Sequence, residues 1–372
     1  MPLPIFQLEE FLGEWEFKAP YYFCGSDAES WSMTEILSWS DQESLKLWNE
    51  LRLGYTEVPG LPVLREEIAS LYDHCSARNI LCLAGAEEGI FCTAKALLSS
   101  EDHAIVIKPC YQSLEALPRD NAGEITALEL VEENGWKLDL AKVKAAIRTN
   151  TKILFINYPH NPTGARLSNS TLTELIEILR QHQIILFSDE VYRMLGSGGA
   201  NDCEPAVASM YELGISLGVM SKAFGLAGLR VGWLAAQDVR LLKKIEHVKH
   251  YTSICNSAPS EILSLIALRA KDAILQRNNH IVAANLDLID AFIKRHDTLF
   301  SWVKPKGGCV GFVRYLGANG VDRFCAQLLD DKGVLVLPGR VYDWHQSNFR
   351  IGFGRKSMVD ALSRMEAFVS GS

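Results

Sequence analysis

Lys222 and Arg230 flank a run of small and apolar residues in SKAFGLAGLRVGW, residues 221–233. A lysine beside small residues is most often a solvated surface group, but an amine held out of water can act as a nucleophile or a base. Arginine offers a planar fork of N–H donors that suits phosphate and carboxylate groups. The segment therefore predicts a chemical site only if other reactive side chains join it.

A second segment, LCLAGAEEGIF at residues 81–91, carries small residues that allow a ligand to approach the backbone. A strand-like run passes through Gly85 and Ala86 into a helix expected to begin near Glu87. Free N–H groups at the start of a helix bind anions such as phosphate. A plain tight turn is the alternative explanation of the same residues.

Two more segments place polar side chains directly after strand-like runs. In NYPHNPTG, residues 157–164, the prolines fix a loop from which the Asn161 amide projects, or in which it caps a rigid turn. In FSDEVYR, residues 187–193, Asp189 ends a strand and Tyr192 follows. A carboxylate leaving a buried strand needs a cation or a strong donor, unless it caps the next helix. Each segment alone leaves both alternatives open.

Between about residues 64 and 236, short apolar runs alternate with amphipathic stretches. This alternation predicts β-α units around a mostly parallel sheet, whose ligands bind beyond the carboxyl ends of the strands. The polar segments above lie at those ends. The expected strands are residues 103–108, 152–157 and 183–188, and the expected covering helices lie around 90–98 and 172–179.

The C-terminal third predicts a second, smaller α+β domain. A long helical pattern covers residues 259–296, and short strand-like pieces follow, including GGCVGFVRY and NFRIGFG. The N-terminal segment is expected to join this domain. Residues 196–200, GSGGA, are expected to form a surface loop.

The composition indicates a soluble globular protein that acts on small molecules. The 372 residues are 48% hydrophobic, carry a net charge of −8 in interspersed charges, and contain no stretch long enough for a membrane span. Neither a nucleic-acid surface nor a membrane partner is therefore expected. The acidic N-terminus lacks the pattern of a secretory signal, and the nine cysteines lack a C-x-x-C pair, which predicts a reduced, cytoplasmic protein. No metal site is expected, because the histidines show no ligand spacing beyond His247-x-x-His250 on a charged helix.

Taken together, these segments resemble the class I/II aminotransferases, the fold-type I enzymes of pyridoxal phosphate (PLP). The resemblance covers most of the chain, in the family's order, from Tyr55 to Arg350. It implies an α/β fold of the aspartate aminotransferase type, in which helices sandwich a mostly parallel sheet beside a smaller α+β domain. Residues 41–265 would form the large PLP-binding domain, and residues 1–40 with 266–372 the small one. The residues that carry the resemblance are Asn161, Asp189, Tyr192, Lys222 and Arg350.

The resemblance implies a role for each of these catalytic positions. Lys222 would form a Schiff base with PLP and, once displaced by a substrate amine, move the proton of the substrate's Cα. Asp189 would pair with the protonated pyridine nitrogen, which makes the ring an electron sink. Asn161 and Tyr192 would hydrogen-bond the cofactor's phenolate oxygen. Arg350, with Asn161, would bind the substrate, and its guanidinium would clamp the α-carboxylate in bidentate fashion.

Other positions would hold the cofactor. Tyr111, in KPCYQSL, matches an aromatic residue that stacks on the pyridine ring. Tyr55, in GYTEVPGLPVLR, matches a tyrosine that reaches the phosphate of the neighbouring subunit, which implies a homodimer. The phosphate ligands would be the backbone around Gly85, Ala86 and Glu87, together with Ser221 and Arg230.

Three departures from the family pattern limit what carries over. Val219 stands where a hydroxyl usually donates to the phosphate, three residues before Lys222. Residues 19–33, APYYFCGSDAESWSM, lack the G-x-P-type segment that closes over the substrate in many members. Glu87 stands where another side chain is common, and an acid near a phosphate is tolerable only if it points away or contributes backbone alone.

The expected activity is transfer of an amino group between an L-amino acid and a 2-oxo acid in a ping-pong cycle. The shortened N-terminus also resembles capreomycidine synthase-type enzymes, so PLP-dependent elimination or cyclisation is the alternative. A non-catalytic regulatory PLP-binding domain is the third possibility, but no basic helix-turn-helix segment precedes the domain and Lys222 is present.

Overall fold

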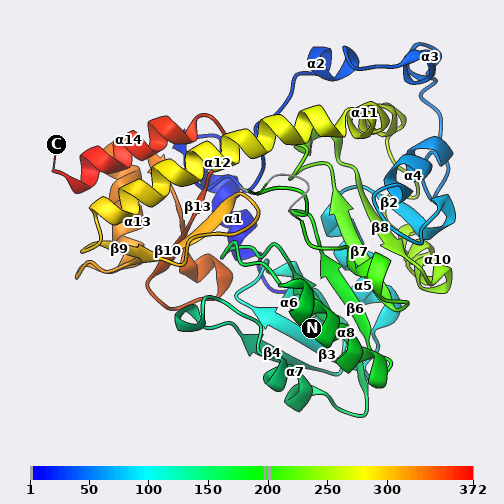
Figure 1. The fold of residues 1–372 in the computed structure, drawn as a ribbon, viewed down its shortest axis with the longest axis horizontal. Helices are drawn as coiled ribbons and strands as arrows, with labels where there is room; N and C mark the ends of the chain where they lie inside the picture. The colour runs from blue at the N-terminus through cyan, green and yellow to red at the C-terminus, as the bar shows by residue number, and fades with distance from the viewer. Residues whose placement is uncertain (1–2, 197, 199–202, 372) are drawn as a thin grey trace.

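The computed structural model describes residues 3–196, 198 and 203–371, and its larger body is built on a seven-stranded sheet (Figure 1). The strand order is β2-β8-β7-β6-β5-β3-β4. Strand β8 runs antiparallel to both of its neighbours, and the other pairs are parallel. The bounds are β2 Ile80–Leu83, β3 His103–Lys108, β4 Glu124–Glu129, β5 Thr151–Asn157, β6 Ile185–Asp189, β7 Gly214–Val219 and β8 Gly232–Ala236. The three expected strands correspond to β3, β5 and β6.

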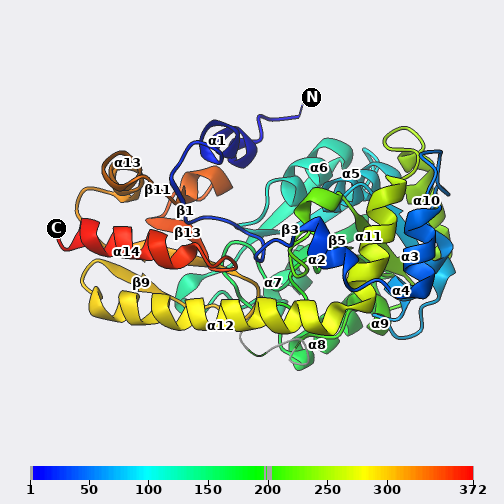
Figure 2. The ribbon, with the colours of Figure 1, turned by 90° about the horizontal axis from the view of Figure 1, so that it is seen from above.

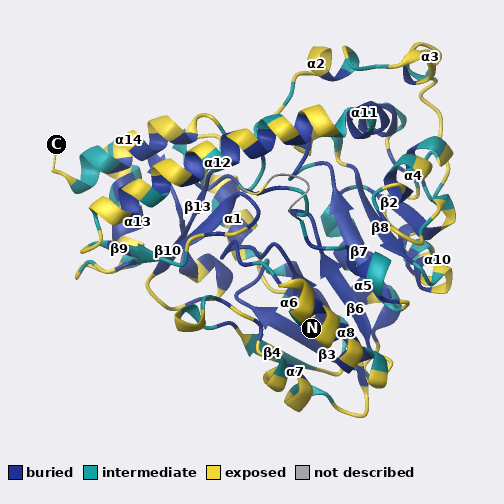
Figure 3. Ribbon diagram, in the orientation of Figure 1, coloured by how far each residue is buried: buried dark blue, intermediate teal, exposed yellow. Residues whose placement is uncertain are grey.

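Helices cover both faces of this sheet, so its strands are almost entirely buried except for the edge strand β4, which is partly exposed (Figure 3). Side chains alternate along β5: Phe155 packs into one apolar cluster with Ile90 of α5, and Leu154 into another with Leu175 of α8. The helices of the N-terminal two thirds are α1 Gln7–Trp15, α2 Met33–Leu37, α3 Gln42–Asn49, α4 Pro62–Ala69, α5 Ala86–Leu97, α6 Ser113–Asn121, α7 Leu140–Ala146, α8 Asn169–Gln181, α9 Val207–Met210 and α10 Val239–Lys249.

The C-terminal part forms a smaller body around an antiparallel sheet of order β12-β13-β10-β9 (Figure 2). The expected helical stretch from 259 to 296 is two helices, α11 and α12, that meet at Ala270. The bounds are α11 Ala258–Arg269, α12 Lys271–Arg295, β9 Phe300–Trp302, β10 Val310–Tyr315, α13 Val321–Lys332, β11 Val334–Leu335, β12 Leu337–Pro338, β13 Asn348–Gly352 and α14 Met358–Val369.

The N-terminal segment packs against this smaller body. Strand β1, Tyr21–Tyr22, pairs in parallel with β11, and α1 contacts the short 3-10 helix Gly339–Tyr342. These contacts support grouping residues 1–40 with 266–372, but the domain boundaries themselves stay predictions. Of the expected loop at 196–200, residues 197, 199 and 200 lie outside the described part of the chain.

The carboxyl ends of the parallel strands face the smaller body, and the candidate residues follow them. Asn157 ends β5 and Asp189 ends β6, and the two are paired across the ladder. Lys222 follows β7 by three residues. No described helix is both long and apolar enough to cross a lipid bilayer.

Candidate active site

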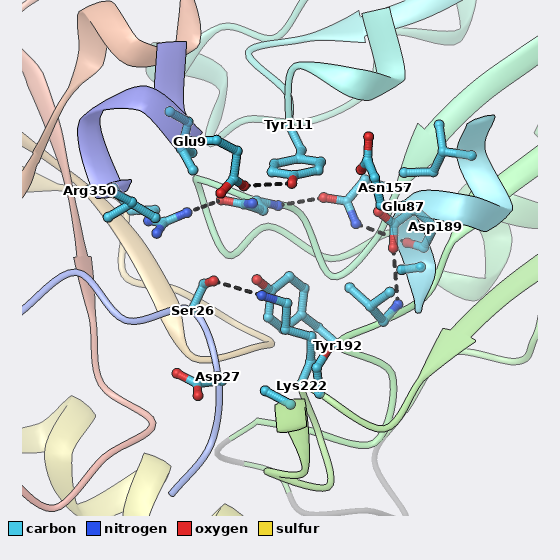
Figure 4. Close-up of a pocket in the computed structure, with 18 of the residues that line it drawn as sticks. Glu9, Ser26, Asp27, Glu87, Tyr111, Asn157, Asp189, Tyr192, Lys222 and Arg350 are labelled. Carbon is cyan, nitrogen blue, oxygen red and sulfur yellow. Dashed lines mark hydrogen bonds between the residues drawn. The ribbon is translucent and has the colours of Figure 1, made fainter. Parts of the chain in front are cut away.

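A cavity of about 370 Å³ opens where the carboxyl ends of the sheet meet the N-terminal segment and β13 (Figure 4). The predicted residues that line it are Ala86, Glu87, Tyr111, Asn161, Asp189, Tyr192, Ser221, Lys222, Arg230 and Arg350. The fold therefore gathers segments that are more than 250 positions apart in the sequence, as the ligand-site rule for α/β sheets predicts.

Lys222 presents its amine inside this cavity. The Nζ atom donates to the Ser26 hydroxyl at 2.8 Å and lies 5.9 Å from the centroid of the Tyr192 ring. Burial lowers the pKa of Lys222, and nearby Asp27 opposes that shift. An amine whose pKa is lowered in this way loses its proton more readily, as a nucleophile and a base must.

Asp189 is a buried carboxyl with few partners. It is 5% exposed, accepts a hydrogen bond from the Val191 N–H at 3.2 Å and forms no ion pair within the described residues. Burial raises its pKa to about 7, while the Val191 N–H and the charge of Lys222 act in the opposite direction. The carboxyl therefore favours a cationic partner, which would keep it ionised.

The Asn161 loop is held by the strand that precedes it. The Asn161 N–H donates to the Asn157 side-chain oxygen at 2.7 Å. The Asn161 side-chain oxygen accepts from the Tyr342 hydroxyl and from Arg350 Nη1, both at 3.1 Å. Its amide thus projects from the end of β5 into the site rather than only capping a turn.

Arg350 and Tyr192 are almost completely buried, at 1% and 2% exposure. Arg350 also donates to the Tyr342 hydroxyl and, at 2.7 Å, to the Cys24 carbonyl, but its Nε atom has no hydrogen-bond partner. The Tyr192 hydroxyl is likewise buried without a hydrogen bond. Buried polar atoms without partners are rare, and these two line one cavity, so they indicate a site for a ligand.

Gly85 and Arg230 form a cradle for an anion at the start of α5. Gly85 has a φ of 98°, and a Cβ atom there would lie 2.7 Å from Arg230 Nη2. The guanidinium and the free N–H groups of the first helical turn therefore meet at one point. Val219 is 4% exposed, buried in the apolar cluster behind the site, so it offers no donor to this cradle.

Glu87 places its carboxyl in the cavity rather than contributing backbone alone. Its Oε1 accepts a hydrogen bond from the Ser113 hydroxyl, and its Oε2 is buried without a partner. Burial raises the pKa of Glu87, with the Ser113 hydrogen bond acting against that shift. A raised pKa favours the neutral acid, which an anion nearby tolerates better than a carboxylate.

Tyr111 follows β3 and presents its ring to the cavity. Its hydroxyl donates to Glu9 Oε1 at 2.8 Å, and its ring packs against Phe6 with centroids 5.2 Å apart. Tyr55 is different: it is 92% exposed and does not line the cavity of its own chain. Its assignment to a neighbouring site stays a prediction.

Several lining residues escaped sequence reasoning. Glu9 comes from α1, and Ser26 and Asp27 come from the loop after β1. Tyr342, from the C-terminal body, does not itself line the cavity but donates a hydrogen bond to the Asn161 side chain, which does. No spacing links these segments to the motifs after the strands. The sequence contained one weak indication of their importance. Residues 19–33 depart from the family pattern, which marked the N-terminal segment as distinctive without assigning it a role.

These features fit PLP part by part. The cradle at Gly85 and Arg230 suits a phosphate, the unpaired Asp189 suits a pyridinium nitrogen, and the unpartnered Tyr192 hydroxyl suits the phenolate oxygen. Lys222 supplies the amine that such enzymes use to hold the cofactor. No group of three or more His, Cys, Asp or Glu side chains in the described ranges is placed to hold a metal ion.

Comparison with known proteins indicates the same class of protein, a PLP-dependent enzyme. Residues 33–364 match the sequence model of the family "Aminotransferase class I and II", so the chain belongs to that family. A structure of a PLP-dependent aminotransferase from Streptococcus suis 89-1591 is 30% identical, with a TM-score of 0.92, over 100% of this chain and 98% of that one. The chain is thus a PLP-dependent enzyme of fold type I, with the predicted aspartate aminotransferase-like fold.

Two further relatives are similar over most of the chain. Capreomycidine synthase of Streptomyces vinaceus is 28% identical over 94% of this chain and 90% of its own length. Aspartate aminotransferase of Bacillus subtilis strain 168 is 26% identical over 88% of this chain and 86% of its own length. The predicted family, cofactor and aminotransferase class are therefore confirmed.

Proposed function

We propose that this aminotransferase moves the amino group of an L-amino acid to a 2-oxo acid, with the residues of the cavity in the roles that follow. The observation that carries the proposal is that partly buried Lys222 and the buried Asp189 and Arg350 line one cavity. Amino transfer requires three groups from the protein: an amine with a lowered pKa, an unpaired carboxyl and a guanidinium.

PLP supplies an electron sink that stabilises negative charge at the substrate's Cα. Lys222 would hold the cofactor and then, as a free amine, take the proton from Cα and return it during transfer. Asp189 would hold the pyridine nitrogen in its protonated form, because its buried carboxylate gains most from a cation. Tyr192 and Asn161 would orient the ring, and Arg230 with the start of α5 would bind the phosphate.

The test of transamination is a single-turnover experiment with the purified holoenzyme. A donor amino acid without a 2-oxo acid should convert the lysine-bound cofactor spectrum into the pyridoxamine spectrum, and a 2-oxo acid should restore it. Product mass analysis should find the 2-oxo acid of the donor. If a broad panel of amino acids leaves the spectrum unchanged, transamination by this protein is refuted.

A second candidate, elimination or cyclisation on an amino acid, draws on two relatives. One is the capreomycidine synthase above, and the other is a structure described as the PLP-dependent cyclase OrfR, 25% identical with a TM-score of 0.88 over 98% of this chain. That chemistry predicts a cyclic product or ammonia without a 2-oxo acid acceptor. The same mass analysis, run with and without acceptor, separates the two reactions.

Arg350→Lys is expected to lower kcat/KM for amino-acid donors by about 100-fold, because a lysine cannot make the bidentate pair with a carboxylate. The control substrate is the corresponding primary amine, which lacks the α-carboxylate. The kcat/KM for this amine should change far less in the same variant. An equal loss for both substrates would show that Arg350 acts through its bonds to Asn161 and Tyr342, not through the substrate.

We further propose a homodimer in which Tyr55 serves the neighbouring site. Tyr55→Phe is expected to weaken PLP binding by about 5- to 10-fold, the loss of one hydrogen bond to a charged group. The decisive sample is a mixed dimer of a Tyr55→Phe chain and a Lys222→Ala chain. If Tyr55 acts across the interface, the functional site regains normal PLP affinity, since its Tyr55 then comes from the other chain. Weak binding in the mixed dimer would place Tyr55 in its own site.

We also place the enzyme in the cytoplasm, acting on amino acids and 2-oxo acids and not on nucleic acid. The nine cysteines are all unpaired, which suits a reducing compartment. The net charge of −8 opposes binding to phosphate backbones.

A further inference from the structure

The cavity contains more carboxylates than its cations can pair. Its described cations are Lys222, Arg230, Arg350 and Arg355. The proposed function assigns the first two to the cofactor and Arg350 to the α-carboxylate of the substrate. Arg355 makes a bidentate ion pair with Asp27, at 2.9 and 2.8 Å. No described cation of the cavity is left for another carboxylate.

Glu9 and Glu87 are the carboxylates that remain. Neither forms an ion pair within the described residues, and their hydrogen bonds come from the neutral hydroxyls of Tyr111 and Ser113. Glu16, at the far end of α1, differs because it is close enough to Arg355 to raise the pKa of that guanidinium. Glu87 also keeps one buried oxygen with no partner at all.

The two carboxylates flank the same aromatic ring. Glu9 approaches the Tyr111 hydroxyl from α1, and Glu87 comes from the first turn of α5 (Figure 4). Burial raises the pKa of Tyr111, and the charges of Glu87 and Glu9 raise it further. Two carboxyls that face one space disfavour each other's ionised form, and a cation placed between them stabilises the ionised form of both.

Independent features show that this space receives a ligand. Arg350 Nε and the Tyr192 hydroxyl, both on side chains at least nine-tenths buried, line the same cavity without hydrogen-bond partners. A substrate whose α-carboxylate meets Arg350 would extend its side chain within reach of the cavity's remaining walls. The charge on those walls then selects among side chains.

We propose that Glu9 and Glu87 bind the cationic side-chain group of the amino donor, so that the enzyme prefers substrates bearing a guanidinium or an ammonium group. This inference rests on the proposed function, because it places the α-carboxylate at Arg350. It makes Glu9 and Glu87 specificity-determining residues. Dicarboxylic donors would be the poorest substrates, because their second carboxylate would meet two carboxyls and no free cation.

The test compares donors of equal shape and different charge. Equilibrium dialysis of the holoenzyme measures the affinity for arginine against citrulline, and for lysine against norleucine. We expect each cationic member to bind at least about 10-fold more tightly than its neutral partner, a typical effect of a partly buried charge pair. A ratio near one, or a preference for glutamate and aspartate, would overturn the proposal.

Variants assign the effect to residues. Glu9→Gln and Glu87→Gln are each expected to reduce the arginine-to-citrulline affinity ratio by about 5-fold or more. Glu10→Gln is the matched control, since Glu10 is the exposed neighbour on α1 and does not line the cavity. Because Glu9 is exposed, its variant should fold even if the Glu87 variant does not. An unchanged ratio in Glu9→Gln would contradict the assignment of Glu9.

The outcome is separable from that of transamination. Where no amino group is transferred, dialysis measures the affinity directly; where transfer occurs, the donor concentration that half-saturates the rate of the absorbance change measures it. A spectrum that no donor changes would refute the proposed reaction, while the affinity ratio would still decide the charge preference.

Discussion

Lys222→Ala is expected to slow amino transfer by about 10⁴-fold and to abolish the visible absorbance of lysine-bound PLP. The variant removes both the amine that attaches the cofactor and the base that moves the Cα proton. Its surroundings explain the size of the effect. Lys222 is the lysine whose Nζ faces the cavity, held there by the Ser26 hydroxyl, so no other described amine of the cavity can replace it.

A second buried lysine provides the internal control for this prediction. Lys249 is 0% exposed, but its amine donates to the carbonyls of Val58 and Cys82 and to Asn256, at 2.5, 2.7 and 3.0 Å. It therefore has a structural role away from the cavity. Reduction of the holoenzyme with borohydride and peptide mass analysis should find the cofactor fixed to Lys222 and not to Lys249. The opposite result, or a retained absorbance band in Lys222→Ala, would overturn the assignment.

Asp189→Asn is expected to reduce turnover by about 10³-fold, because a neutral amide cannot hold the pyridine nitrogen in its protonated form. Binding of PLP should weaken much less than turnover falls, since the phosphate cradle is intact. A variant that loses affinity and turnover in equal measure would show that Asp189 only positions the cofactor.

The cofactor-free protein gives a second, independent measurement on Asp189. A carboxyl whose pKa rises from 3.8 to about 7 on folding binds its proton more tightly in the folded chain. Its contribution to the free energy of unfolding therefore falls as pH rises from about 4 to about 7, by about 4 kcal/mol in total. Denaturant titrations should therefore show that the free energy of unfolding of wild type falls with pH over this range relative to that of Asp189→Asn. Parallel pH profiles would contradict the raised pKa.

The sequence predicted the parts of this protein that depend on local pattern. Continuous apolar runs marked β3, β5 and β6 because strands buried on both faces have no polar side. The residues after those runs were then placed correctly at one edge of the sheet, because parallel strands end together. Asn161 and Asp189 could be found in this way, although each alone was equally compatible with a cap.

Only the tertiary structure decided which distant residues complete the site. Glu9 and Ser26 reach the cavity, and Tyr342 reaches Asn161 and Arg350 beside it, because β1 pairs with β11 and α1 packs on Gly339–Tyr342, contacts that no local periodicity encodes. The structure also decided the position of the Glu87 carboxyl, which lines the cavity, whereas the sequence only set the condition that an acid near a phosphate must point away or contribute backbone alone. The physical reason is that burial and neighbouring charge set the chemistry of a side chain, and both arise only when segments far apart in the chain come together.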